Sequence, residues 1–126
     1  MHEALSGLPD GEFRILAFAA ETPEAVFALP TYRCASARVD ALVFNPDPLK
    51  RALGARAISP APVRLAREMV LLAARAAGTL ALDAAFQDPS DLEGLRAEAL
   101  AARADGFDGK LAIDPRQVAV INEIFA

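Results

Sequence analysis

Blocks of apolar residues along the chain alternate with amphipathic or polar segments in a way that predicts strands followed by helices. Four short and nearly continuous apolar runs have the length of strands covered on both faces: residues 13–20, 39–44, 79–82 and 110–113. A segment with helix-start signals or turn residues follows each run. Four strand–helix units in a row imply parallel strands joined by right-handed crossovers. We therefore expect an α/β fold with one parallel sheet.

Helix boundaries in the first half of the chain are marked by caps and prolines. Thr22-Pro23 opens a helix that runs to about Ala35, and Pro30 is able to break it into two pieces. The segment 59–62 opens a longer helix, and Gly78 ends it. One apolar stripe at helical spacing runs along this longer helix, formed by Val63, Ala66, Met69, Val70, Ala73 and Ala77.

The second half of the chain carries further boundary signals. Ser90 followed by Glu93 predicts a capping box, and Asp105-Gly106 predicts the end of that helix. Asp114-Pro115 starts the last helix, with Asp as N-cap and Gln117 completing a second box.

The remaining segments are predicted to be irregular, and the length of the chain bounds the fold. Residues 1–12 form a loose or briefly helical lead-in, and residues 45–60, with prolines at 46 and 48, form a long loop with one helical turn near 49–53. With 126 residues, of which 54% are hydrophobic, the chain forms a single domain. A complete (β/α)8 barrel (TIM barrel) needs about 250 residues, so four βα units are half of one. An open parallel sheet exposes two edge strands, which predicts self-association or pairing with a missing half.

Charge and cysteine content exclude several classes of partner and indicate a compartment. The net charge is −4, and the 13 Lys and Arg residues are spread along the chain, which makes nucleic acid an unexpected partner. No apolar run approaches the roughly 20 residues that a membrane span needs. A single cysteine, Cys34, and the lack of a recognisable leader segment indicate a reducing cytoplasm.

Four acidic residues are expected at the carboxyl ends of the strands, where parallel α/β folds collect their reactive groups: Glu21, Asp47, Asp83 and Asp114. Glu21 and Asp47 follow consecutive strands, which lie about 4.8 Å apart in a sheet, so both could reach one ion. Magnesium commonly takes one or two carboxylates and fills its other positions with water and substrate oxygens. The alternatives are a solvated Glu21 and an Asp47 that only turns the chain.

The other candidates are better explained by structure. We expect Asp83 to hold loops together at the rim of the sheet and Asp114 to cap a helix. His2 is the only histidine and lies in the lead-in, so a histidine-based triad is not expected. Cys34 is expected to pack as a small apolar group. No catalytic residue is assigned from the sequence.

Several motifs resemble those of the HpcH/HpaI aldolase and citrate lyase beta-subunit (CitE-like) family. The densest match lies in the last third of the chain: Asp88-x-x-Asp91-Leu-Glu-Gly-Leu, then Gly106-Phe-Asp-Gly109-Lys-Leu-Ala-Ile113-x-Pro115-x-Gln117-Val, then Ile121-Asn122-Glu-x-Phe125. A sparser match extends back through Glu21-Thr22-Pro23-Glu-Ala-Val26 and Ala35-Ser36-Ala-Arg38-Val39-x-Ala41-Leu42. The resemblance implies that residues 1–126 are the C-terminal half of a (β/α)8 barrel.

This resemblance also implies a magnesium ion and its ligands. Glu21 stands where the family has its magnesium-binding glutamate, and through the ion it would also bind substrate. Family members usually carry Gly-x-Glu-Asp-Leu after the next strand, and the last acid is the second ligand. An ungapped comparison puts Pro48 at that ligand position and Asp47 one residue before it, so Asp47 needs a one-residue slip of the loop to bind the ion.

The function implied by the resemblance is a magnesium-dependent carbon–carbon lyase similar to citryl-CoA or malyl-CoA lyases, with an oxo or hydroxy acid or its CoA ester as substrate. The family's substrate-binding arginine belongs to the first half of the barrel, so the isolated chain is expected to be incomplete or inactive. The alternative is a non-catalytic half-barrel, or a subunit that assembles with a separate N-terminal half. A third possibility is a small ligand-binding module that uses the loop 45–60. The sequence leaves the substrate acid, the use of CoA and the oligomeric number open.

Overall fold

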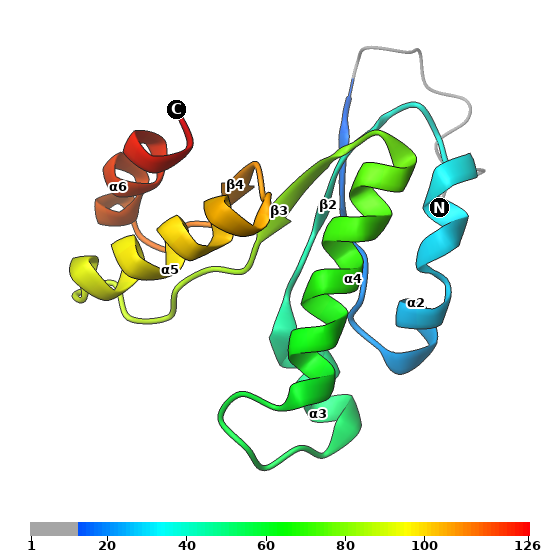
Figure 1. Ribbon diagram of the computed structural model, residues 1–126, viewed down its shortest axis with the longest axis horizontal. Coiled ribbons are helices and arrows are strands. Elements are labelled where there is room, and N and C mark those ends of the chain that lie inside the picture. The colour runs from blue at the N-terminus through cyan, green and yellow to red at the C-terminus, as the bar shows by residue number, and fades with distance from the viewer. Residues whose placement is uncertain (1–12) are drawn as a thin grey trace.

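Four parallel strands form one sheet in the computed structural model, which describes residues 13–126 (Figure 1). The strands follow one another in the sheet in the order of the sequence: β1 (Ile15–Phe18), β2 (Val39–Val43), β3 (Leu80–Asp83) and β4 (Gly109–Lys110). All three pairings are parallel. The predicted α/β class with one parallel sheet of four strands is therefore confirmed.

Helices connect the strands as crossovers. They are α2 (Pro23–Phe27), the 3₁₀ helix η1 (Leu29–Cys34), α3 (Pro46–Leu53), α4 (Ala61–Ala77) and α5 (Leu92–Asp105). A last helix, α6 (Pro115–Phe125), follows β4. The first predicted helix is indeed broken, because α2 ends at Phe27 and Pro30 lies in the first turn of η1. Figure 1 shows α2 beside α4, and α5 paired with α6 beyond β3. Within residues 13–126, no helix is both long enough and apolar enough to cross a membrane.

The predicted loop 45–60 contains a helix of eight residues, α3, so the helical turn expected near 49–53 is confirmed and the expectation of a loop was wrong over residues 46–48. Pro46 and Pro48 lie in the first turn of α3, where backbone N–H groups have no partner inside the helix. Proline therefore costs little there, and its fixed φ favours the first helical position. Gly54 ends α3 at a φ of 63°, a left-handed conformation that favours glycine.

The fourth strand is shorter than the run 110–113 predicted. β4 ends at Lys110, and Ile113 is 51% exposed. The side chain of Gln117 accepts a hydrogen bond from the Ile113 amide at 2.8 Å, so this amide is not available for a sheet ladder. The sequence predicted that Gln117 completes a capping box with Asp114, and this prediction was wrong, because the Gln117 oxygen accepts from Ile113 instead.

The start of α5 also differs from the prediction. Asp91, not Ser90, is the N-cap, and its carboxylate accepts a hydrogen bond from the Gly94 amide at 2.9 Å. Ser90 instead donates its hydroxyl to Asp88 at 2.6 Å. A carboxylate accepts a stronger, charge-assisted bond from a helix N-terminus than a hydroxyl does, which accounts for the choice.

Two hydrophobic clusters hold the elements together. The larger one joins the helix-facing side of the sheet, represented by Ala17, Leu42 and Ala81, to the buried stripe of α4. This stripe consists of Val63, Ala66, Val70 and Ala74. The smaller cluster joins α5 and α6 through Leu95, Ala99, Val120, Ile121 and Ile124. Cys34 is exposed, so the expectation that it packs as an apolar group was wrong. His2 and the lead-in 1–12 lie outside the described residues.

Asp108, just before β4, connects this strand to α4. Its carboxylate accepts hydrogen bonds from Arg75 Nη1 and from the Ala81 amide, both at 2.8 Å. Partial burial raises the pKa of Asp108, but the bonds from Arg75 and from the Ala81 amide outweigh burial, and the pKa lies below its ordinary value. Because the folded-state pKa is depressed, Asp108 stabilises the fold above the unfolded pKa of about 4, and this contribution is lost as pH falls through the folded pKa.

We expect Asp108→Asn to lose less of its free energy of unfolding than the unchanged protein does as the pH falls below about 4. The side chain is 31% exposed, so solvent screening limits the effect to about 1 kcal/mol at pH 7. Thermal unfolding followed between pH 7 and pH 3 for both proteins measures the difference. Parallel profiles for the two proteins would show that Asp108 carries no pH-linked stability.

Candidate functional site

Glu21 and Asp47 lie at the same edge of the sheet, beyond two neighbouring strands. β1 and β2 end together, since Phe18 is paired with Val43, and the Ala19 amide donates to the Val43 carbonyl at 3.2 Å. Glu21 follows β1 and precedes the N-cap of α2. Asp47 lies in the first turn of α3, directly after β2. The structure therefore confirms that both residues lie beyond the carboxyl ends of adjacent strands.

The side chains of Glu21 and Asp47 offer oxygen atoms that no other group in residues 13–126 engages. Glu21 is half-buried and Asp47 is exposed, and neither accepts a hydrogen bond or forms an ion pair with another described residue. The described part of the chain contains no cluster of three or more acidic, histidine or cysteine residues arranged to hold a metal. Magnesium needs only one or two carboxylates, so this donor set fits the ion that the family resemblance implies.

A cavity of about 710 Å³ opens at the same end of the sheet. Asp47 contributes to its wall, together with the ends of β2 and β3 and parts of α4 and α5, whereas Glu21 lies outside the lining. Acidic side chains in the wall (Asp47, Glu68, Asp83, Asp88, Glu98 and Asp105) outnumber the basic ones (Lys50, Arg64 and Arg67). Asp83, Glu98 and Asp105 form ion pairs with Arg67 or Lys110, so the excess of acids does not by itself select a cation over an anion.

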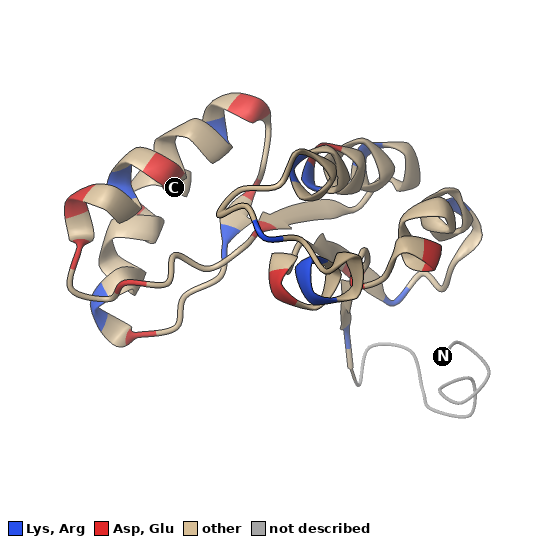
Figure 2. Ribbon diagram, turned by 90° about the horizontal axis from the view of Figure 1, so that it is seen from below, with Lys and Arg blue, Asp and Glu red and all other residues tan. Residues whose placement is uncertain are grey.

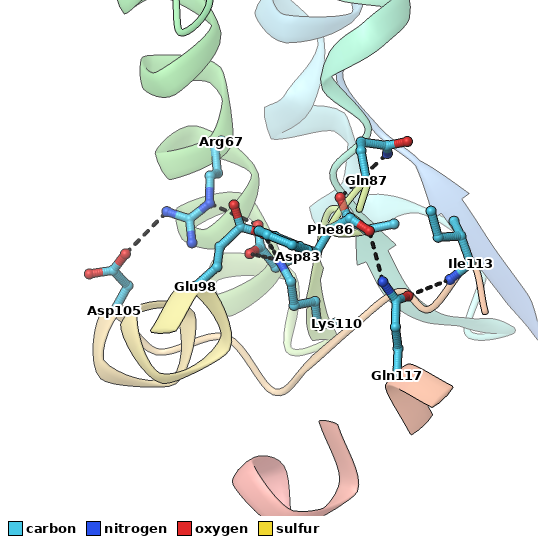
Figure 3. Close-up of polar contacts among 10 residues, drawn as sticks. Arg67, Asp83, Phe86, Gln87, Glu98, Asp105, Lys110, Ile113 and Gln117 are labelled. Atoms are coloured by element: carbon cyan, nitrogen blue, oxygen red, sulfur yellow. Dashed lines mark hydrogen bonds and ion pairs between the residues drawn. The ribbon is translucent and has the colours of Figure 1, made fainter. Parts of the chain in front are cut away.

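Asp83 is the centre of a buried ionic cluster on one side of this cavity (Figure 3). Its two carboxylate oxygens accept from Arg67 Nε at 2.8 Å and from Lys110 Nζ at 3.0 Å. Lys110 also pairs with Glu98 at 2.5 Å, and Arg67 with Asp105 at 3.1 Å. The side chains of Asp83 and Lys110 are 3% and 0% exposed. Asp83 thus connects β3 to α4 and β4. The prediction that it holds loops together at the rim of the sheet was wrong.

Arg67 is charged and held in one orientation. Burial lowers the pKa of Arg67, but its hydrogen bonds to Asp83 and Asp105 outweigh burial and raise the pKa above its ordinary value. The guanidinium carbon also lies 4.5 Å from the centre of the Phe107 ring. Sequence reasoning missed this residue and Lys110, which binds the other oxygen of Asp83. A signal was present, because Arg67 occurs inside the apolar stripe of α4, next to Ala66.

Gln117 connects the start of α6 to the loop after β3 (Figure 3). It is fully buried, and its amide nitrogen donates to the Phe86 carbonyl at 2.9 Å while its oxygen accepts from Ile113. Asp114 caps α6 by accepting from the Arg116 amide at 2.8 Å, as expected. Its pKa is lowered by hydrogen bonds from the Arg116 side chain and backbone. Charged residues of both signs are interspersed over the helices (Figure 2).

Comparison with known proteins decides the family. The sequence model of the HpcH/HpaI aldolase/citrate lyase family matches residues 5–115. The chain belongs to this family. A citrate lyase subunit beta from Haemophilus influenzae is 33% identical over 126 residues, which are 98% of this chain and 43% of that protein.

Two solved structures contain the fold of this chain. RipC from Yersinia pestis superposes with a TM-score of 0.84 at 31% identity, over 98% of this chain and 56% of that one. CitE from Mycobacterium tuberculosis, in complex with magnesium, acetoacetate and coenzyme A, superposes with a TM-score of 0.78 at 30% identity, over 98% and 54%. The chain thus spans about half the length of these three proteins, and its four βα units correspond to part of a (β/α) barrel.

Proposed function

We propose that this chain is the metal-binding part of a magnesium-dependent carbon–carbon lyase that acts on a small oxo or hydroxy acid or on its CoA ester. The observation that carries the proposal is the pair of unengaged carboxylates, Glu21 and Asp47, at the ends of adjacent strands. The relatives support it, since a citrate lyase subunit beta and a CitE protein holding magnesium, acetoacetate and coenzyme A share the fold. A cytoplasmic location is part of the proposal and is based on the single cysteine.

Glu21 and Asp47 would hold the magnesium ion by one oxygen or more each. A magnesium ion bound there supplies a Lewis acid that polarises substrate oxygens and stabilises negative charge as a carbon–carbon bond breaks. Other residues of the chain shape the cavity beside it. Lys50 donates to the Ile58 carbonyl at 3.2 Å, and Arg64 donates to the Ser59 carbonyl. Both bonds fix the segment between α3 and α4, which forms part of the cavity wall.

A second candidate function is a non-catalytic half-barrel, or a subunit that a separate N-terminal half completes. The observation that favours it is Pro48, which stands where the family resemblance places the second metal ligand and offers no side-chain oxygen. The resemblance also places the substrate-binding arginine outside the motifs that this chain carries. In this case Asp47 and Glu21 would be surface carboxylates without a metal.

Calorimetric titration of magnesium together with glyoxylate or pyruvate distinguishes the two candidates. We expect saturable heat from the unchanged chain, and a loss of affinity of at least tenfold for Glu21→Ala, because half of the carboxylate ligands is removed. Glu24→Ala is the matched control, since Glu24 is an exposed acid in the first turn of α2 and should leave the titration unchanged. Absence of heat, or the same heat from Glu21→Ala and the unchanged chain, would reject the metal site and favour the second candidate.

A further inference from the structure

One face of the sheet carries large apolar side chains that remain about half exposed in the part of the chain that the structure describes. Side chains of a strand alternate between faces, so the row Ala17, Leu42 and Ala81 points to the helices. The neighbouring rows point away from them, and they contain Leu16, Phe18 and Leu80, which are 54%, 47% and 51% exposed. Ala41 and Val43, the β2 members of the same rows, are buried. An exposed apolar surface of this kind marks a site of association.

Within residues 13–126, no further strand pairs with the outer side of β1 or β4, and the direction of these edges allows closure by a second copy. β1 forms one edge and β4 the other, and all four strands run in the same direction. A two-fold axis parallel to the strands would place β4 of one copy beside β1 of its partner, twice, with every strand still parallel. Two sheets of four then give eight strands, the number at which a closed barrel is just filled by its inward side chains.

Charges at the two edges are complementary. Arg14 lies directly before β1 and pairs with Asp40, while Asp108 lies directly before β4 and pairs with Arg75. Both residues are thus at the amino ends of the strands, on opposite edges of the sheet. In a two-fold pair, Arg14 of one copy faces Asp108 of the other across each seam, which joins the two existing ion pairs into one network.

We propose that a second copy of this chain docks on the face formed by Leu16, Phe18 and Leu80, with β1 of each copy beside β4 of the other. The proposal makes specific the self-association expected from the open edges, and it rests on the fold and not on the lyase activity. Closure buries the exposed apolar face and pairs both edge strands. It also places the two Glu21–Asp47 pairs on the same rim of the barrel.

Light scattering and sedimentation of the pure chain test the assembly. We expect twice the chain mass of 13.3 kDa at micromolar concentration. Phe18→Lys places a charge in the interface and should raise the dimer dissociation constant at least a hundredfold, while circular dichroism stays that of the folded chain. Leu72→Lys is the matched control, because Leu72 is a 70% exposed leucine on α4 and should leave the dimer intact. A monomeric chain, a dimer that survives Phe18→Lys, or a dimer that only Leu72→Lys disrupts would overturn the proposal.

Disulfide cross-linking tests the seam itself, and it does so without an interface charge that could prevent folding. Arg14→Cys and Asp108→Cys are made separately, each together with Cys34→Ser, and the two proteins are mixed and oxidised. We expect a covalent dimer from the mixture and little from either protein alone, because each seam joins residue 14 of one copy to residue 108 of the other and a disulfide needs Cα atoms within about 7 Å. Equal cross-linking of Arg14→Cys with itself, or none in the mixture, would rule out this arrangement. Magnesium titration of the same samples reports the lyase proposal separately.

Discussion

Replacing Asp83 by alanine should lower the free energy of unfolding by about 3 kcal/mol. The substitution removes the carboxylate shared by Arg67 and Lys110, whose ammonium group is fully buried. A buried cation that loses a partner keeps the cost of its desolvation without the compensating attraction. The effect stays near the low end of the usual range for a broken buried pair, because Glu98 and Asp105 remain beside the two cations. Urea unfolding of both proteins at pH 7 measures it.

Two further variants show whether burial is the cause. Asp105→Asn removes an ion pair whose carboxylate is 55% exposed, so it should cost at most about 1 kcal/mol. Combining Asp83→Ala with Lys110→Met removes both charges of the buried pair and should cost less than the sum of the single changes. If the double variant loses as much stability as the two single variants together, or if Asp83→Ala is as stable as Asp105→Asn, the cluster does not act as a buried unit.

The second large effect concerns Gln117, and we expect Gln117→Leu to lower the free energy of unfolding by about 2 kcal/mol. Leucine keeps the approximate volume of the side chain but leaves the Ile113 amide and the Phe86 carbonyl without their hydrogen-bond partner. Each buried polar group left unpaired costs about 1 to 3 kcal/mol, and partial access of water reduces the sum. Hydrogen exchange at the Ile113 amide should accelerate in the same variant.

Gln87→Leu is the matched control for this change. Gln87 lies in the same loop as Phe86, is exposed, and forms one long hydrogen bond of 3.4 Å to the Ala85 carbonyl. The control should leave both stability and exchange at Ile113 nearly unchanged. Equal destabilisation by the two variants would show that Gln117 does not tie α6 to the loop after β3.

Local signals of the sequence predicted the succession of elements well. The cap and proline at Thr22-Pro23, the glycine at Gly78 and the Asp-Pro pair at Asp114-Pro115 each mark a boundary that the structure has. These signals depend on φ preferences and on unpaired helix-end amides, which are properties of a few adjacent residues. The prolines of α3 misled the prediction, because the same residues begin a helix or exclude one depending on where its first turn lies.

The candidate site was predicted in part. The sequence placed Glu21 and Asp47 at the ends of adjacent strands, and the binding of magnesium by them stays a prediction. The ionic cluster around Asp83 was not predicted, since its members come from two strands, β3 and β4, and two helices, α4 and α5. They are Arg67, Asp83, Lys110 and Glu98. Only a charged residue inside the apolar stripe of α4 indicated that a buried partner had to exist.

The sequence by itself determined the alternation of four strands with helices and the family, because both are written in short stretches of chain as apolar periodicity, caps and motifs. Tertiary structure decided the burial of Asp83 and Lys110, the use of Gln117 as a connection between α6 and the loop after β3, and the exposure of Leu16, Phe18 and Leu80. These features depend on which surfaces meet across more than twenty residues of sequence. An apolar residue in a strand is buried only where another layer covers its face, and the sequence pattern does not state whether that layer belongs to the same chain.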